Sequence, residues 1–289
     1  MKQAILITAF KNFDQLSEIA KFFDEDFSVY IHIDKKGGAL ASDLTKLEGL
    51  SNVVLVGQKY KVNWGGRNHL RCILFLISEA LKDKNIQYFH LITGQDFPIK
   101  SKEAFKEFFN KNKEKDFLEH FTMPAACWNQ GGMDRIEYYN LYDALDAKKS
   151  ISTILKVLNI QKKFGLKRRL SKKLPTLYGG STYWSLSRTT TNYINDYNGK
   201  NPSLLKRLKH TFCAEEIYMQ TVVMNSELKD RAISNNLRFI LWEEKHGSNP
   251  GVLDEMDFNA ILESDAFFAR KFDTPVSESL LQKLKENHS

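Results

Sequence analysis

Two hydrophobic periods alternate along the first hundred residues. Four short apolar runs, rich in branched and aromatic side chains, span residues 4–9, 27–33, 53–56 and 88–92. Such runs predict buried β-strands. Residues 13–23 and 68–81 repeat apolar positions every three or four residues, which predicts amphipathic helices. Strands that alternate with helices predict an α/β fold with a mostly parallel central sheet and helices on both faces.

The fourth apolar run leads into the stretch around which the chain is organised. Thr93 to Asp96 interrupt the run with turn-forming residues, and Pro98 cannot simply continue a strand. Ser101 precedes apolar residues at helical spacing, so it is the predicted N-cap of a helix. A carboxylate at the carboxyl end of a central strand lies where open α/β sheets bind ligands. Asp96 is therefore a candidate site residue, and the alternative is that it only caps a turn.

The second half has a less regular pattern. Strands are predicted at residues 116–121, 183–186 and 239–242, and a loop at 128–132. Helices are predicted at residues 189–197, 213–224, 257–264 and 277–287. The chain contains no repeat, low-complexity tract or linker, so we expect residues 1–289 to form one domain.

Charge is concentrated in one segment. The net charge of +7 favours an anionic partner. Residues 148–173 carry many lysines and arginines, interleaved with apolar residues and without one acidic residue. This composition is typical of a basic amphipathic helix on an anionic membrane surface. The alternative is a solvated basic insert. A nucleic-acid partner would depend on this stretch alone, and we do not expect one.

Cysteine content and hydropathy indicate a compartment. Cys72, Cys127 and Cys213 are odd in number and widely spaced, which suits neither a disulfide framework nor a zinc site and suggests a reducing environment. No apolar run approaches the roughly 18–20 residues that span a bilayer. Residues 1–10 lack the pattern of a secretory signal. The expectation is a cytoplasmic protein, either soluble or peripheral at the inner membrane face.

Several common motifs are missing from the sequence. It has no Walker loop and no Gly-x-Gly-x-x-Gly after the first strand, which argues against a P-loop NTPase and a Rossmann dehydrogenase. It also has no HExxH, CxxC or histidine cluster for a metal. Asp24-Glu25-Asp26 has the spacing of a DxD metal motif, but it precedes the second strand, away from the carboxyl ends. We expect it to be a solvated turn.

The remaining polar candidates are expected where sheets of this kind bind substrates. They are Asp34, Trp64-Gly65-Gly66, Gln95-Asp96, Gly179-Gly180-Ser181, Glu215-Glu216 and Arg270-Lys271. A helix N-terminus favours an anion, and paired glycines let backbone approach a ligand closely. Each candidate alone is a weak signal, since a Gly pair is usually a turn and a Glu pair at a helix start usually favours the helix dipole.

The order of these pieces resembles the core-2/I-branching β-1,6-N-acetylglucosaminyltransferase family, which includes the peptide O-xylosyltransferases. The matching pieces are residues 31–36 (IHIDKK), 62–66 (VNWGG), 90–100 (HLITGQDFPIK), 117–119 (FLE), 179–184 (GGSTYW), 214–216 (AEE) and 268–273 (FARKFD). The likeness spans nearly the whole chain, but no family motif covers residues 146–173.

The resemblance implies a GT-A type fold, with a Rossmann-like nucleotide-binding half at residues 1–110 and an acceptor and catalytic half at residues 111–289. It implies inverting transfer from a UDP-sugar, with no cofactor and no divalent metal. The physical chemistry agrees, because a departing UDP needs cations or dipoles, and basic residues occur late in the sequence.

The resemblance also assigns roles to residues. Glu216 falls on the catalytic base, and Lys271 on the lysine that neutralises the diphosphate, with Arg270 assisting. The nucleotide side is expected to contain Asp34, Trp64 and Gly65. The donor and acceptor side is expected to contain Asp96, Glu119, Gly180, Ser181 and Trp242.

Two departures from the family pattern affect these roles. The usual Pro-Asp-Glu is Ala214-Glu215-Glu216 here, and Glu216 is preferred as base because it keeps the family offset to the downstream residues. A second basic diphosphate ligand found in animal members aligns with Ser248 or its neighbours. Candidates to replace it are His246, Lys245 and Arg270.

The sequence therefore predicts an enzyme that transfers a sugar from a UDP-sugar to a hydroxyl of a glycan or glycolipid. N-acetylglucosamine is the first choice of sugar, and cell-surface polysaccharide synthesis the expected role. The alternatives are a xylosyltransferase of the same family and a non-catalytic protein that binds UDP-sugars or glycans.

Overall fold

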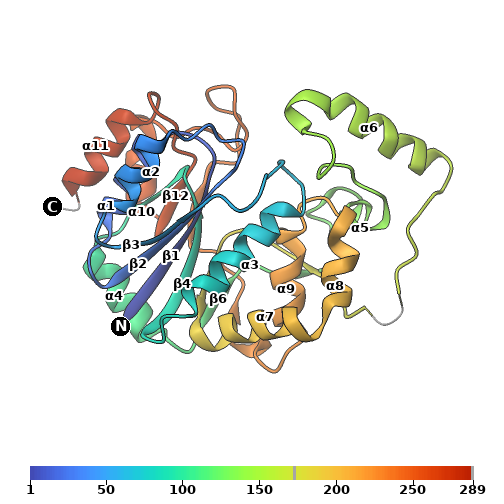
Figure 1. Ribbon diagram of the computed structural model, residues 1–289, viewed down its shortest axis with the longest axis horizontal. Helices are drawn as coiled ribbons and strands as arrows, with labels where there is room; N and C mark the ends of the chain where they lie inside the picture. The colour runs from blue at the N-terminus through green and yellow to red at the C-terminus, as the bar shows by residue number, and fades with distance from the viewer. Residues whose placement is uncertain (172–173, 288–289) are drawn as a thin grey trace.

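The computed structural model describes residues 1–171 and 174–287. Within them, the central sheet has seven strands in the order β10-β6-β9-β4-β1-β2-β3 (Figure 1). Their bounds are β1 (Lys2–Ala9), β2 (Phe27–Ile33), β3 (Val53–Gly57), β4 (Ile86–Thr93), β6 (Asp116–Leu118), β9 (Trp184–Ser187) and β10 (Ala232–Ile233). β9 is antiparallel to β4 and β6, while the other pairs are parallel. The predicted mostly parallel α/β sheet is confirmed.

Helices cover both faces of this sheet, as predicted (Figure 1). On one face the core contains side chains of α1 (Phe13–Phe22), α2 (Ala41–Glu48), α4 (Lys102–Lys111), α10 (Phe258–Glu263) and α11 (Glu278–Asn287). On the other it contains side chains of α3 (Asn68–Ala80), α7 (Arg188–Lys200), α8 (Pro202–Arg207) and α9 (Glu215–Met224). The apolar run of β1 is continuous because both faces of the strand are buried. Ile5 and Ile7 pack in the first core, and Ala4 and Leu6 pack in the second.

Two smaller sheets lie beside the central one. β5 (Asp96–Pro98), β12 (Phe268–Arg270) and β11 (Arg238–Ile240) form one, and β7 (Phe121–Thr122) pairs with β8 (Tyr178–Gly179) in the other. β5 is an edge strand, which is where a sheet tolerates Pro98. In the β5–β12 pair, Arg270 stands opposite Asp96.

The remaining elements are short, except for one helix that projects from the body. They are α5 (Asp134–Glu137), α6 (Ala147–Lys163) and the 3₁₀ turns η1 (Asn129–Gly132), η2 (Leu208–His210), η3 (Lys229–Arg231) and η4 (Glu255–Asp257). α6, the projecting helix, is the basic amphipathic helix predicted from the sequence (Figure 1). Among the described residues, no helix has the length and apolar content to cross a membrane.

Most predicted elements are confirmed to within a few residues. The side chain of Ser101 accepts a hydrogen bond from the backbone N–H of Ala104 at 3.2 Å, as an N-cap does. The predicted strand at residues 116–121 was wrong as one element, because the chain turns at Glu119 and His120 to pair with a different sheet. The predicted loop at residues 128–132 contains η1, with Gln130 and Gly131 in left-handed conformations. The basic helix ends at Lys163, and Lys172 and Lys173 lie outside the described residues.

Candidate active site

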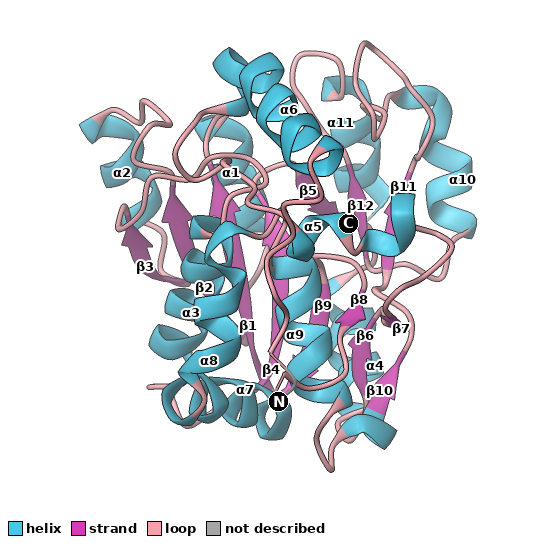
Figure 2. Ribbon diagram, turned by 90° about the vertical axis from the view of Figure 1, so that its right-hand side faces the viewer, coloured by secondary structure: helices cyan, strands magenta, loops and turns pink. Residues whose placement is uncertain are grey.

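The candidate site lies at the carboxyl edge of the central sheet. His69, in the first turn of α3, connects three elements there. Its Nε2 lies 3.2 Å from the hydroxyl of Thr8 near the end of β1, and its Nδ1 lies 3.1 Å from Glu215, the first residue of α9. The ends of β1, α3 and α9 therefore meet at this edge, and α5 and α6 lie above it (Figure 2).

Glu216 is held by an arginine that the sequence did not single out. Nη1 of Arg135, from α5, donates to Glu216 Oε2 at 2.5 Å, and its guanidinium lies 3.7 Å from the centre of the Trp128 ring. The other carboxylate oxygen lies 3.4 Å from the Thr182 hydroxyl, and 26% of the side chain remains exposed. One oxygen is thus oriented by a cation while the other is available to accept a proton.

The environment of Glu216 suits a base. Burial raises the pKa of its carboxyl group, and the negative charge of Glu215 raises it further, while Arg135 opposes both. A general base works best when its pKa approaches the working pH. Glu215 is itself buried and paired with His69. This geometry favours Glu216 over Glu215, and its catalytic role stays a prediction.

Gly180 joins the start of α9 to the end of β6. Its N–H donates to the backbone carbonyl of Glu216 at 3.0 Å, and a Cβ at this position would overlap the carbonyl oxygen of Glu119. Only glycine fits this approach without a backbone shift. The carboxylate of Glu119 accepts a hydrogen bond from Asn236 at 2.7 Å, and the hydroxyl of Ser181 accepts one from the N–H of Tyr183 at 3.3 Å. Gly180 thus contacts the backbone of both Glu216 and Glu119, and the predicted roles of Glu119, Gly180 and Ser181 toward donor and acceptor stay predictions.

Asp96 caps a turn and also faces a buried cation. One of its oxygens accepts hydrogen bonds from the N–H and the hydroxyl of Thr93. The other lies 3.6 Å from Arg270 Nη1 and has no hydrogen-bond partner among the described residues. Arg270 stacks on Tyr183 at 4.3 Å, and its Nε and Nη1 are buried without a described hydrogen-bond acceptor. Buried donors that lack a protein acceptor fit an anionic ligand. The structure confirms that Asp96 caps the turn, and its role toward donor or acceptor stays a prediction.

Lys271 continues this cationic group. It is half-buried and donates to the hydroxyl of Ser248 at 3.0 Å. Burial lowers the pKa of its ammonium group, and the charges of Arg270 and Lys11 lower it further. A bound diphosphate would offset that repulsion. Ser248, the position aligned with a second basic ligand, thus lies against Lys271.

Two of the predicted substitutes for that second ligand are already paired. Lys245 lies 2.9 Å from Asp254 and 2.7 Å from Asp257, and His246 lies 2.7 Å from Asp254. Arg270 is the candidate whose donors remain unfilled among the described residues. The geometry therefore favours Arg270 as the second cation.

The predicted nucleotide side is built on the loop after β3. Asp34 Oδ1 accepts from the backbone N–H groups of Lys36 at 3.0 Å and Val62 at 2.9 Å, which fixes this loop against the end of β2. Trp64 is 62% exposed. Gly65 has φ of +75°, and a Cβ there would overlap the Phe212 ring, so the turn before α3 requires glycine.

Trp242 lies on the loop after β11 and is 69% exposed. No described contact joins it to Glu216, Glu119 or Lys271, so the structure does not bring it into the group formed by the other candidates.

Residues 24–26 lie at the opposite edge. Asp24 and Asp26 pair with Lys106 of α4 at 2.9 Å and 2.6 Å, before β2 begins. The prediction of a solvated turn is confirmed. Among the described residues, no group of three or more His, Cys, Asp or Glu side chains could hold a metal ion. Metal independence stays a prediction.

Sequence reasoning missed Arg135, His69 and Tyr183. His69 had a weak signal, because it lies one turn into a helix that follows a Gly-Gly pair. Arg135 had none, since its partner Glu216 is 81 residues away in the chain.

A family model described as "Branch: Core-2/I-Branching enzyme" matches residues 4–261. The chain belongs to the Core-2/I-Branching enzyme family. The resemblance inferred from the sequence is confirmed.

The curated relatives of this family member are longer proteins. It is 26% identical to a xylosyltransferase of Ciona intestinalis over 93% of this chain and 32% of that protein. It is 24% identical to xylosyltransferase 2 of Homo sapiens over 93% of this chain and 31% of that protein. The chain thus spans about a third of the relatives it matches. A solved structure of S. aureus TarS 1-349 in complex with UDP is 16% identical, over 43% of this chain and 36% of that chain, with a TM-score of 0.30. This similarity is too low to support a conclusion about the present chain.

The raised pKa of Glu216 predicts how stability depends on pH. A carboxyl group whose pKa rises on folding contributes stability below its unfolded pKa and loses that contribution as the pH rises through its folded pKa. Glu216→Gln removes this titration. We therefore expect the free energy of unfolding of the variant, relative to the wild type, to increase as the pH rises above the ordinary carboxyl pKa of 4.5.

Urea unfolding across this pH range measures the difference. Glu107→Gln, at an exposed position on α4, is the matched control and should show no such trend. A Glu216→Gln difference that stays constant with pH would contradict the raised pKa.

Proposed function

We propose that this protein is an inverting glycosyltransferase that moves a sugar from a UDP-sugar to a glycan hydroxyl. The observation that carries the proposal is the arrangement at one sheet edge. Glu216, partly exposed and oriented by Arg135, lies at the start of α9, and its free oxygen lies 3.4 Å from the hydroxyl of Thr182. The next residue, Tyr183, stacks on Arg270. A base and a cationic group for a leaving diphosphate are thereby joined through adjacent residues.

The proposed reaction needs one proton acceptor and one anion site. Glu216 takes the proton of the acceptor hydroxyl while that oxygen attacks the anomeric carbon from the face opposite UDP. The bond between the anomeric carbon and the diphosphate breaks, and UDP leaves with its negative charge. Lys271 and the unfilled donors of Arg270 stabilise that charge. Protein cations supply this stabilisation, so we propose that no divalent metal is required.

Two donors are supported by different observations. The family resemblance in the motifs favours UDP-N-acetylglucosamine. The names of the curated relatives favour UDP-xylose as the second candidate. For the acceptor we propose a hydroxyl of a cell-surface polysaccharide or of its lipid-linked precursor. Cys72, Cys127 and Cys213 are free thiols, which supports synthesis in the reducing cytoplasm.

Removing the base should slow turnover strongly and leave the nucleotide site intact. We expect Glu216→Gln to lower kcat by roughly 10²-fold or more, because an amide cannot accept the proton. Release of UDP from a donor with acceptor present measures turnover, and calorimetry measures UDP affinity, which should stay near wild type. Glu107→Gln is the control. Normal turnover in Glu216→Gln would exclude this residue as the base, and UDP binding without transfer by the wild type would favour a non-catalytic binding protein.

Removing the diphosphate cation should act on binding. We expect Lys271→Ala to weaken UDP affinity by about 10-fold or more, the effect of losing a charged hydrogen bond. Lys106→Ala changes the net charge equally but lies at the opposite edge of the sheet, so its UDP affinity should be unchanged. Equal affinities of the Lys271→Ala variant and the wild type would remove Lys271 from the diphosphate site.

A screen of donors identifies the sugar and tests for a metal together. Ligand that binds the folded state raises the melting temperature. We expect the largest rise with UDP-N-acetylglucosamine, compared with UDP and UDP-xylose, and the same rises in EDTA. A larger rise with UDP-xylose would assign the second donor. Loss of the rises in EDTA would contradict metal independence.

A further inference from the structure

We infer that α6 and the segment after it form a docking surface for an anionic lipid membrane. This surface consists of Lys149, Lys156, Lys163, Phe164 and Leu166. It deepens the proposed function by placing the candidate site beside lipid-linked acceptors, but its evidence is independent of catalysis.

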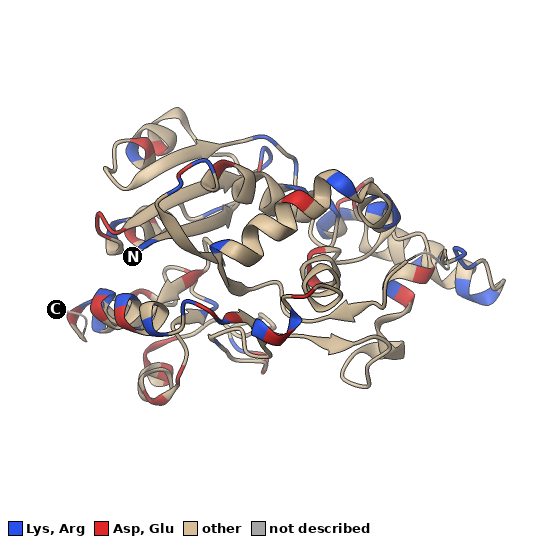
Figure 3. Ribbon diagram, turned by 90° about the horizontal axis from the view of Figure 1, so that it is seen from below, with Lys and Arg blue, Asp and Glu red and all other residues tan. Residues whose placement is uncertain are grey.

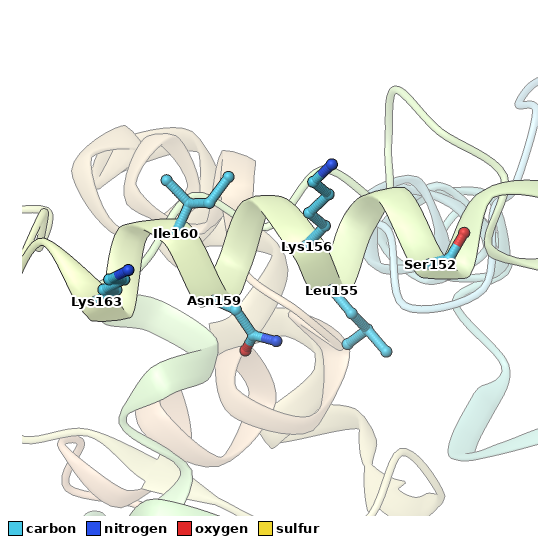
Figure 4. A pocket seen from close by; sticks show the side chains of 6 residues that line it. All are labelled: Ser152, Leu155, Lys156, Asn159, Ile160 and Lys163. Atoms are coloured by element: carbon cyan, nitrogen blue, oxygen red, sulfur yellow. The ribbon is translucent and has the colours of Figure 1, made fainter.

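One narrow face of α6 packs on the protein. Ala147, Ile154 and Gln161, spaced seven residues apart, are buried, and Ala147 and Ile154 form a small core with Tyr142. Val157, Leu158 and Lys162 are half-buried, and most other residues of the helix are exposed. Figure 4 shows Lys156 and Ile160 projecting from one side of the helix, with Leu155 and Asn159 on the other.

The exposed cations of the docking surface have no protein partners of opposite charge. Lys162 pairs with Asp134 at 3.0 Å and Lys167 with Glu137 at 2.6 Å, so these two lysines hold the helix to the body. Lys149, Lys156 and Lys163 form no ion pair with any described carboxylate. Lysines and arginines also gather at the end of the molecule that this helix forms (Figure 3). Such a group attracts an anionic surface.

Apolar exposure at the end of α6 selects lipid over a hydrophilic polyanion. Phe164 is 67% exposed and Leu166 is 57% exposed, and they flank Gly165 directly after the helix. A nucleic acid or acidic polysaccharide would neutralise the lysines but leave these two side chains in water. A bilayer accepts both, with the lysines at the head groups and the apolar pair at the acyl boundary.

The docking surface is held in place before binding, on the same side as the candidate site. At its start, Asp146 caps α6 and pairs at 2.8 Å with Lys36, which follows β2. Lys148 lies 4.9 Å from the ring of Phe10, which follows β1. After the helix, Arg168 donates to the carbonyl of Arg207 at 2.7 Å. Docking through α6 would therefore bring the carboxyl edge of the sheet to the membrane.

The test is flotation of the full chain with vesicles of phosphatidylcholine, with and without about one-third anionic phosphatidylglycerol, in the absence of donor and acceptor. We expect binding to the anionic vesicles only. Lys149→Gln/Lys156→Gln/Lys163→Gln should weaken it by about 5-fold per lysine, equivalent to about 1 kcal/mol each. Phe164→Ser/Leu166→Ser should also weaken it.

The control Lys111→Gln/Lys113→Gln/Lys115→Gln removes the same charge from exposed positions at the opposite edge. Its vesicle binding should differ from that of the wild type only by the small effect of the lower net charge.

Three outcomes would overturn the inference. The first is that the wild type does not bind anionic vesicles. The second is that the α6 and control variants lose vesicle binding equally. The third is that Phe164→Ser/Leu166→Ser keeps full vesicle binding and soluble DNA displaces the protein, which would indicate a polyanion site. UDP affinity and melting temperature, measured in solution, should stay at wild-type values in every variant because the changed side chains are exposed. If a combined variant unfolds, the single changes Lys156→Gln and Phe164→Ser must each weaken flotation, or the inference fails. Vesicle binding and glycosyl transfer are measured separately, so either can fail alone.

Discussion

Two adjacent glutamates at the start of α9 impose the constraint that organises the site. Neighbouring carboxylates repel each other, and burial makes each negative charge more costly. The fold gives each one its own partner, His69 of α3 for Glu215 and Arg135 of α5 for Glu216. Because His69 also contacts Thr8, this arrangement ties α9 to α3, α5 and the end of β1. Glu216, the proposed base, therefore attaches α5 to α9, while Glu215 attaches α3 and, through His69, the end of β1.

The opposite charge is placed on the small sheet beside the central one. Pairing of β5 with β12 sets Arg270 against Asp96, and Lys271 follows immediately. One oxygen of Asp96 accepts hydrogen bonds in the turn after β4. Nε and Nη1 of Arg270 therefore have no hydrogen-bond acceptor among the described residues. A fully paired arginine would hold the fold equally well but would have no donors left for a ligand. Tyr183 connects the cationic group to the carboxylate of Glu216. Its ring stacks on Arg270, and the hydroxyl of the preceding residue, Thr182, lies 3.4 Å from Glu216.

Much of the fold could be predicted from local pattern. Parallel strands that are buried on both faces are apolar along nearly their whole length. Continuous apolar runs therefore identified β1, β2 and β4 in the sequence. Helical spacing revealed α1, α3 and α6, and Ser101 marked a helix start. Strands of two or three residues such as β10 and β12 carry no period to detect. The reversed direction of β9 also has no local signal, because it depends on which neighbours the strand meets.

For the site, the sequence by itself determined which chemical groups are present and, through the order of its motifs, the family to which they belong. It placed Asp96 after a strand and Glu216 at a helix start, because such positions have recognisable compositions, whereas Arg270 and Lys271 were assigned only through the family resemblance. Only the tertiary structure decided their partners. Arg135 reaches Glu216 across 81 residues and His69 reaches Glu215 across 146, and such pairings arise from sheet order and helix packing rather than from any local pattern. Packing also gives Lys245 two carboxylate partners, whereas Arg270 faces Asp96 at 3.6 Å and keeps buried donors without a hydrogen-bond acceptor among the described residues.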